Sequence, residues 1–120
     1  MQKIKLIAVL MAVTFATACY EALEPSMENV EVVLVAPVNN LVTTDSVHTF
    51  FWEEVERATE YELQIVSPRF DSIARFVMDT VVTKNQFTAE LDKGVHEWRV
   101  RAMNNSTVSP FSAVRRLTIQ

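Results

Sequence analysis

The chain has 120 residues, of which 49% are hydrophobic, and a formal net charge of −4 at pH 7. This length predicts one domain at most. Phosphate backbones repel an acidic protein, so nucleic acid is excluded as the expected partner. The sequence contains a single cysteine, which rules out an intramolecular disulfide.

Residues 1–18 have the layout of a secretory signal peptide. Lys3 and Lys5 precede an uncharged apolar run over residues 6–18, which ends in small side chains. A helix needs roughly 20 apolar residues to span a bilayer, and this run is shorter. We therefore predict export of the protein, in preference to a permanent transmembrane helix.

Cys19 directly follows the small residues 16–18, with sequence Ala-Thr-Ala. This arrangement resembles the processing site of bacterial lipoproteins, in which the cysteine is diacylated on sulfur and becomes the new N-terminus. Ala16 departs from the leucine that is usual in that family. The resemblance implies membrane attachment through lipid on Cys19 and a place in the cell envelope, at the outer membrane. Residues 16–18 also fit ordinary signal peptidase, and that alternative predicts a soluble periplasmic protein.

Residues 19–29 are predicted to form the lipidated cysteine and a tether. The segment is acidic, is interrupted by Pro25 and has no sustained period. Removing residues 1–18 takes away two lysines, which changes the net charge from −4 to −6. An acidic surface does not attract anionic lipids, so acyl chains must supply the anchor. The folded domain is predicted to span residues 30–120.

Short β-branched or alternating segments, separated by turn signals, make up this domain. The predicted strands are Val30–Ala36, Val47–Glu53, Tyr61–Val66, a strand near Arg75–Val81, Gln86–Leu91, Gly94–Met103 and Ala113–Ile119. Asn39-Asn40 predicts a turn, and Ser67-Pro68 is predicted to end the third strand. Seven strands with no helix predict an all-β fold, a seven-stranded antiparallel β-sandwich.

The strand Gly94–Met103 has the clearest pattern in the chain. Its side chains alternate, so His96, Trp98, Val100 and Ala102 share one face, which we predict to be inward. In the second and third strands, the same alternation predicts inward faces for His48, Phe50 and Trp52 and for Tyr61, Leu63 and Ile65. These faces would form the core between two sheets.

Trp52, Tyr61 and the run Trp98-Arg99-Val100-Arg101-Ala102 together resemble the fibronectin type III family over residues 30–120. The resemblance implies an immunoglobulin-like sandwich in which Trp52 and Tyr61 pack between the sheets. His96 occupies the position where the family has the tyrosine of the tyrosine corner. An imidazole can still donate a hydrogen bond to the backbone there. This fold hosts many unrelated roles, so it implies no particular activity.

The same resemblance implies that the third strand pairs with Gly94–Met103, which in turn pairs with the last strand. Charged and polar side chains would then share the outward face of one sheet: Glu60, Glu62, Gln64, Arg99, Arg101 and Arg116. Opposite charges on adjacent strands form a ladder that keeps a sheet soluble. The alternative is a polar docking surface. Among the aromatic residues Phe51, Phe70, Phe76 and Phe111, Phe111 is the best candidate for exposure or for packing on a partner.

Catalytic and metal-binding constellations are missing from the sequence pattern. His48 and His96 fall on predicted inward faces, which favours core histidines over metal ligands. Glu53, Glu54 and Glu56 lie in a polar loop without the apolar pocket that raises the pKa of a catalytic carboxyl. One glycine cannot build a phosphate-binding loop. We predict a non-enzyme with no cofactor and no metal.

Three Asp-Ser/Thr-aliphatic triplets resemble the acceptor of a bacterial O-glycosylation system. The candidate acceptors are Ser46, Ser72 and Thr80. Asp-Ser pairs also form turns without any modification.

These observations predict a non-catalytic exported lipoprotein that presents one fibronectin type III-like interaction or scaffold module at the bacterial envelope. Its partner would be a protein or a glycan. One alternative is a carbohydrate-binding accessory lipoprotein of an outer-membrane uptake system, which a wall of exposed aromatics would favour. The other is a soluble periplasmic binding module.

Overall fold

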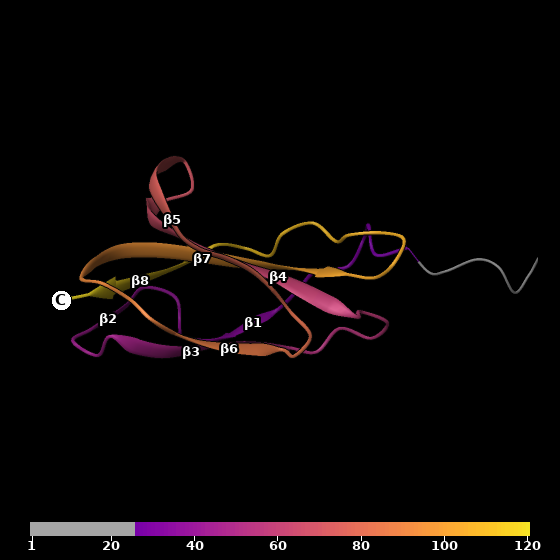
Figure 1. Ribbon diagram of the computed structural model, residues 1–120, viewed down its shortest axis with the longest axis horizontal. Coiled ribbons are helices and arrows are strands. Elements are labelled where there is room, and N and C mark those ends of the chain that lie inside the picture. The colour runs from indigo at the N-terminus through magenta and orange to yellow at the C-terminus, as the bar shows by residue number, and fades with distance from the viewer. Residues whose placement is uncertain (1–25) are drawn as a thin grey trace, which may run out of the picture.

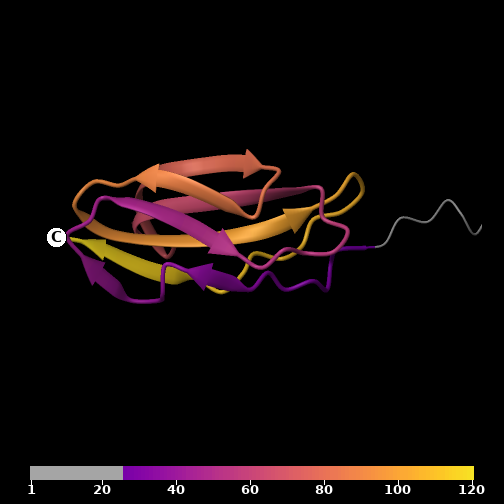
Figure 2. The ribbon, with the colours of Figure 1, turned by 90° about the horizontal axis from the view of Figure 1, so that it is seen from below.

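The computed structural model describes residues 26–120, which form two β-sheets packed face to face (Figure 1). The strands are β1 (Leu34–Ala36), β2 (Leu41–Thr43), β3 (Val47–Trp52), β4 (Glu60–Arg69), β5 (Ser72–Val82), β6 (Gln86–Glu90), β7 (Gly94–Met103) and β8 (Arg115–Ile119). One sheet has the order β1-β3-β6 and the other β2-β8-β7-β4-β5. Figure 2 shows the same two layers after a quarter turn. The predicted all-β sandwich is confirmed.

The predicted signal peptide, Cys19 and the first part of the tether lie outside the described residues. Within residues 26–120, no helix has the length and apolar character needed to cross a membrane. Figure 1 shows the described chain entering the sandwich at one end and the C-terminus leaving it at the opposite end. The first described residues and the C-terminus therefore lie at opposite ends of the domain.

The described chain contains eight strands rather than the predicted seven, and one pair is parallel. The additional strand is β2, which pairs in parallel with β8 through Leu41–Leu117, Val42–Thr118 and Thr43–Ile119. The turn before β2 is the predicted one, and Asn40 adopts a φ of 64° there, a conformation that asparagine tolerates. A three-residue strand leaves too short a pattern to be recognised in the sequence.

The prediction that Ser67-Pro68 ends the third strand is wrong, because β4 continues to Arg69. The ladder between β4 and β7 ends at Val66, whereas Pro68 pairs with Ile73 of β5. Pro68 therefore lies where β4 has a strand on one side only. This is a position where a sheet accepts proline, since no ladder hydrogen bond is lost on the open side.

The inward faces predicted for β3, β4 and β7 form the core, except that His48 at the start of β3 is only half-buried and lies outside the core cluster. Trp52 and Tyr61 meet edge to face with ring centroids 5.5 Å apart, and Phe50 and Trp98 meet in the same way at 4.9 Å. Trp52, Phe50 and Trp98 are fully buried, and Tyr61 is nearly so. Aromatic pairs in this geometry contribute about 0.5–1.5 kcal/mol beyond their buried area. The register predicted from alternation is confirmed.

The core extends beyond the predicted domain boundary at Val30. Met27 is only 2% exposed and packs in the same cluster as Trp52. Its backbone N–H donates to Thr107 Oγ1 at 2.8 Å, and its carbonyl accepts from Val30 N at 3.1 Å. Met27 therefore packs in the core from within the segment that was predicted to be a tether. Because Met27 lies in an acidic segment, the sequence pattern gives no sign that this one residue is buried.

Arg115 joins the two sheets at one open side of the sandwich. Its Nη2 donates to the carbonyl of Leu34 at 2.7 Å, and its Nη1 donates to the carbonyls of Val35 and Pro37 at 3.0 and 2.8 Å. Hydrogen bonds from a charged donor are stronger than those between neutral groups. The guanidinium therefore holds β8 of one sheet against β1 of the other.

Candidate functional site

The predicted polar face is present on the outer side of β4 and β7. Glu62 lies opposite Arg101 and Gln64 lies opposite Arg99, as the strand register requires. Glu62 Oε1 accepts from Arg101 Nε at 2.7 Å and from Nη2 at 2.6 Å. Glu60 lies opposite Met103 and is exposed. The predicted cross-strand ladder is therefore confirmed in its geometry.

Gln64 connects the acidic and basic members of this face. Its Oε1 accepts from Arg99 Nε at 3.0 Å, while its Nε2 donates to Asp79 Oδ2 at 3.3 Å and to Glu62 Oε2 at 3.5 Å. Gln64 faces outward as predicted, yet it is only 8% exposed. The outer face of the sheet is thus covered by further side chains.

Two phenylalanines supply this cover. Phe70, at the tip of the β4–β5 hairpin, and Phe111, in the β7–β8 connection, lie on either side of Arg99. Arg101 also packs on Phe111, with its Cζ 4.6 Å from the ring centroid. We call this group, Phe70, Arg99, Phe111 and Arg101, the outer stack. Phe111 is half-buried, so it is not the exposed aromatic that the sequence suggested.

Burial shifts the pKa values of two charged groups on this face, Glu62 and Arg99. Burial raises the pKa of Glu62, and a hydrogen bond with Asp79 adds to the effect, whereas Arg101 opposes it. Burial lowers the pKa of Arg99, and the nearby charge of Arg101 acts in the same direction. Desolvation disfavours the charged form of either group. These shifts reflect packing within the sheet surface and do not identify a catalytic group.

Arg116 lies further along the same face and pairs with Glu97. Arg116 Nη2 lies 3.1 Å from Glu97 Oε2, and Glu97 Oε1 accepts from the backbone N–H of Phe70 at 2.9 Å. The carboxylate therefore ties β8 to the tip of the β4–β5 hairpin. Most charges of the predicted binding face are thus matched by neighbours within the sheet, which favours the solubilising ladder over a docking surface.

Two serines that the sequence analysis overlooked hold the β7–β8 connection against β7. Ser109 and Ala102 exchange two hydrogen bonds: Ser109 N donates to Ala102 O, and Ala102 N donates to Ser109 Oγ, both at 2.8 Å. Ser112 and Val100 are joined in the same way at 2.7 and 3.0 Å. The two hydroxyls accept backbone hydrogen bonds from β7 at Val100 and Ala102, where β8 no longer pairs with it. The available signal was two serines three residues apart in the segment between two alternating strands.

His96 has the role that the resemblance implied. It is 1% exposed, and its Nε2 donates to the carbonyl of Asp92 at 2.8 Å. His48 is half-exposed and donates from Nε2 to the carbonyl of Asp45 at 2.7 Å. Both imidazoles therefore bind backbone, and no group of three or more potential metal ligands occurs in the part of the chain that the structure describes.

The carboxylates of the β3–β4 loop do not form a catalytic pair. Glu53, Glu54 and Glu56 are all exposed. A general acid needs an apolar environment that holds the proton at neutral pH, and this loop does not provide one.

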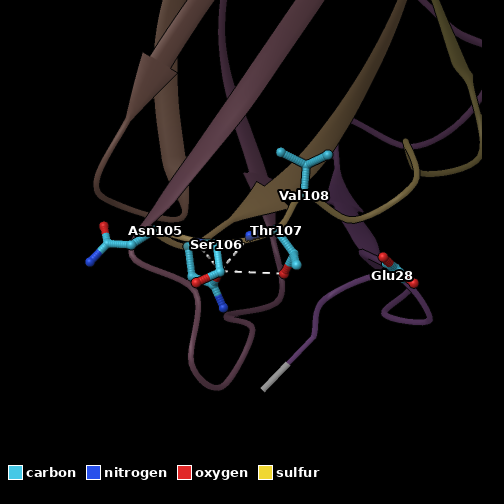
Figure 3. Close-up of a pocket in the computed structure, with 6 residues that line it drawn as sticks. Glu28, Asn105, Ser106, Thr107 and Val108 are labelled. Carbon is cyan, nitrogen blue, oxygen red and sulfur yellow. Dashed lines mark hydrogen bonds between the residues drawn. The ribbon is translucent and has the colours of Figure 1, made fainter. Parts of the chain in front are cut away.

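An open pocket of about 460 Å³ lies at the end of the sandwich where the described chain begins (Figure 3). Its lining consists of Glu28 and residues 104–108. Asn104 Oδ1 accepts from the backbone N–H groups of Ser106 and Thr107, which shapes the turn. No aromatic side chain lines the pocket, and none of the predicted binding-face residues reaches it.

The three candidate glycosylation acceptors differ in access. Ser72 is exposed at the start of β5 beside the hairpin turn. Thr80 is half-buried and pairs with Leu63, so it lies on the core side of β5. Ser46 is half-buried, and its carbonyl accepts from Leu91 N at 2.8 Å. The structure thus distinguishes one open acceptor from two restricted ones.

No protein-family model and no curated protein sequence matches the chain. Solved structures with similar folds include the fibronectin(III)-like modules of CbhA from Clostridium thermocellum. That match has a TM-score of 0.54 and 13% identity, and it covers 74% of this chain and 95% of the other. The fibronectin type III domain of a human fibronectin type III domain containing protein is also similar, with a TM-score of 0.52, 15% identity and coverage of 80% and 90%. The chain therefore has a fibronectin type III-like fold, a two-sheet β-sandwich.

Proposed function

We propose that this chain is a lipid-anchored, non-catalytic protein of the bacterial envelope that presents its fibronectin type III-like module to a protein partner. The observation that carries the non-catalytic part is the outer stack. Its two arginines, Arg99 and Arg101, are already bonded to Gln64 and Glu62, and in residues 26–120 no group of three or more potential metal ligands accompanies them. A module of this kind acts by binding.

The anchor is supported by the sequence alone. The single cysteine follows three small residues and a short apolar run, which is the arrangement that lipidation needs. Intact-mass measurement of the protein extracted from membranes tests this directly. We expect a chain that starts at Cys19 and carries diacylglycerol. An unmodified N-terminus at that position would instead favour the soluble periplasmic alternative.

The absence of a row of exposed rings in residues 26–120 favours a protein partner over a glycan. Of the four candidate aromatics, Phe51, Phe70 and Phe111 are half-buried and only Phe76, at 54%, is mostly exposed. Sugar recognition by stacking needs an accessible flat ring surface. Affinity electrophoresis in gels that contain soluble polysaccharides is expected to show no retardation. Retardation that is lost on Phe76→Ala would favour the carbohydrate-binding alternative.

Ser72 is the acceptor that we propose for O-glycosylation, because it is exposed at the start of β5, next to the hairpin turn. Mass spectrometry of the protein from its natural host is expected to show a glycan that Ser72→Ala removes. Ser46→Ala and Thr80→Ala serve as matched variants and are expected to leave the mass increment in place. A single unmodified mass for the wild-type chain would disprove this proposal.

A further inference from the structure

The outer strand β5 has an edge that no other described strand pairs with. It is the last strand of its sheet, and its 11 residues make it the longest strand of the domain. Its exposed apolar side chains are Ile73 at 40%, Phe76 at 54% and Val81 at 51%. Figure 1 shows β5 on the outside of the sandwich, near the hairpin tip that stands above the sheet. An edge strand with unpaired N–H and C=O groups is a template for one further strand.

Only part of this edge is regular. The register with β4 shifts at two places, which leaves Val77 and Ala74 without partners on β4. Such bulges twist an edge and hinder pairing. The stretch Met78–Val82 has an unbroken register with β4. Five residues match the usual length of a strand, so a partner strand would pair here.

The outer face of this stretch carries the carboxylate of Asp79, which interacts with Glu62 and with the charge of Arg99 without forming an ion pair with that arginine. Asp79 is opposite Gln64, whose Nε2 reaches the carboxylate at 3.3 Å. In residues 26–120 no arginine or lysine nitrogen forms an ion pair with Asp79, whereas the neighbouring Glu62 is paired with Arg101. Asp79 is exposed. Along the edge it has apolar Phe76 on one side and Val81 on the other.

We propose that the Met78–Val82 edge binds an extended strand of a protein partner. That strand carries a lysine or arginine opposite Asp79 and apolar side chains that contact Phe76 and Val81. Backbone hydrogen bonds supply the affinity of this mode of binding, and the alternate side chains supply its selectivity. This inference deepens the proposed function, on which it rests, by naming the surface and the chemistry of the partner.

A second copy of this chain fits the edge poorly. Antiparallel self-pairing centred on Thr80 places Asp79 opposite Val81 of the other copy, and self-pairing centred on Asp79 places two carboxylates together. Neither register supplies the missing cation, and like charges directly opposite are destabilising. In these two registers the charge pattern therefore favours a different polypeptide.

Two capped heptapeptides test the inference on the ¹⁵N-labelled full chain. The first, Thr-Val-Thr-Lys-Thr-Val-Thr, presents lysine between two valines on one face, and the second has glutamate in place of lysine. We expect the lysine peptide to shift the amide resonances of Met78–Val82 and to slow their hydrogen exchange. The glutamate peptide is expected to bind at least about fivefold more weakly. Its carboxylate replaces an exposed ion pair with Asp79 by a repulsion between two like charges.

Variants separate the edge from the rest of the surface. Asp79→Asn is expected to remove the preference for lysine over glutamate, and Val81→Pro to abolish binding of both peptides. Thr88→Lys, on β6 of the other sheet, is the matched control and is expected to leave binding unchanged. If Val81→Pro reduces folding, Asp79→Asn alone still decides the charge preference.

Three outcomes would overturn the inference: no change at Met78–Val82 with either peptide, equal binding of both, or a concentration-dependent dimer in sedimentation that Val81→Pro disrupts. The last result would identify a second copy as the occupant. Cross-linking in intact cells from Phe76 and, separately, from Val47 on the opposite sheet keeps the two proposals distinct. Capture of one defined protein from Val47 alone would leave the interaction module standing and reject this edge.

Discussion

The guanidinium of Arg99 lies between the rings of Phe70 and Phe111, with its Cζ 4.2 Å and 4.0 Å from the two ring centroids. Two connections that are distant in sequence, the β4–β5 hairpin and the β7–β8 segment, thus meet on one side chain of β7. A planar cation between two aromatic faces gains attraction on both sides. This contact makes the outer face a packed layer of the domain.

Arg99→Lys tests that layer. Lysine keeps the charge but loses the planar face and the 3.0 Å bond from Nε to Gln64 Oε1, so we expect a loss of about 1–2 kcal/mol in the free energy of unfolding. Arg116→Lys is the control, because Arg116 forms an ion pair with Glu97 on a side chain that is 43% exposed. Chemical denaturation compares the two. Equal effects would mean that stacking contributes little.

Trp52→Ala is expected to unfold much of the population at growth temperature. Truncation of a buried aromatic costs roughly 3–5 kcal/mol, and a small domain has about 5–15 kcal/mol in total. Arg101→Ala should cost less, about 1–2 kcal/mol, because it loses a partly buried ion pair and the contact with Phe111. Urea denaturation that shows Arg101→Ala to be the more damaging change would contradict the assignment of inner and outer faces.

Ser112→Ala is expected to cost about 1–3 kcal/mol, because it leaves the backbone N–H of Val100 without its hydroxyl partner in a buried setting. Ser72→Ala, at the exposed start of β5, is the control and should change stability by less than about 0.5 kcal/mol. Thermal unfolding of unmodified protein measures both. A negligible effect of Ser112→Ala would show that water reaches Val100 N.

The stability contribution of Glu62 depends on pH in a direction that follows from its raised pKa. The folded state binds the proton of the Glu62 carboxyl group more tightly than the unfolded chain does, because the pKa of Glu62 is raised above its reference value of 4.5. The contribution is complete below that value and is lost as the pH rises through the higher pKa of the folded state. The unfolding free energy of the wild type relative to that of Glu62→Gln should therefore fall as the pH rises above about 4.5. A difference that grows would mean that Arg101 outweighs burial.

Met27→Ala is expected to destabilise the domain by about 2 kcal/mol, toward the low end for buried methionine because the terminal segment can adjust. A chain that begins at Val30 should lose at least as much, whereas one that begins at Ser26 should match the full chain. Denaturation midpoints of the three decide where the domain starts. A chain from Val30 with unchanged stability would restore the boundary that the sequence suggested.

The sequence by itself determined the class of fold and the orientation of its longest strands. Alternation in Gly94–Met103 requires Trp98 and Val100 to share a face, since successive side chains of a strand point in opposite directions. The same period placed Glu62 and Arg101 on the outer side. These are local properties of an extended backbone, so the order of residues is enough to reveal them.

Only the tertiary structure decided which distant groups meet. Phe70 reaches Arg99 because β4 continues past Pro68, and Met27 enters the core from a segment with the composition of a linker. β2 is a strand only because β8 lies beside it. Such contacts depend on how loops return across a sheet, and no local period records that return. For the same reason, only the tertiary structure shows that Asp79 forms no ion pair within residues 26–120.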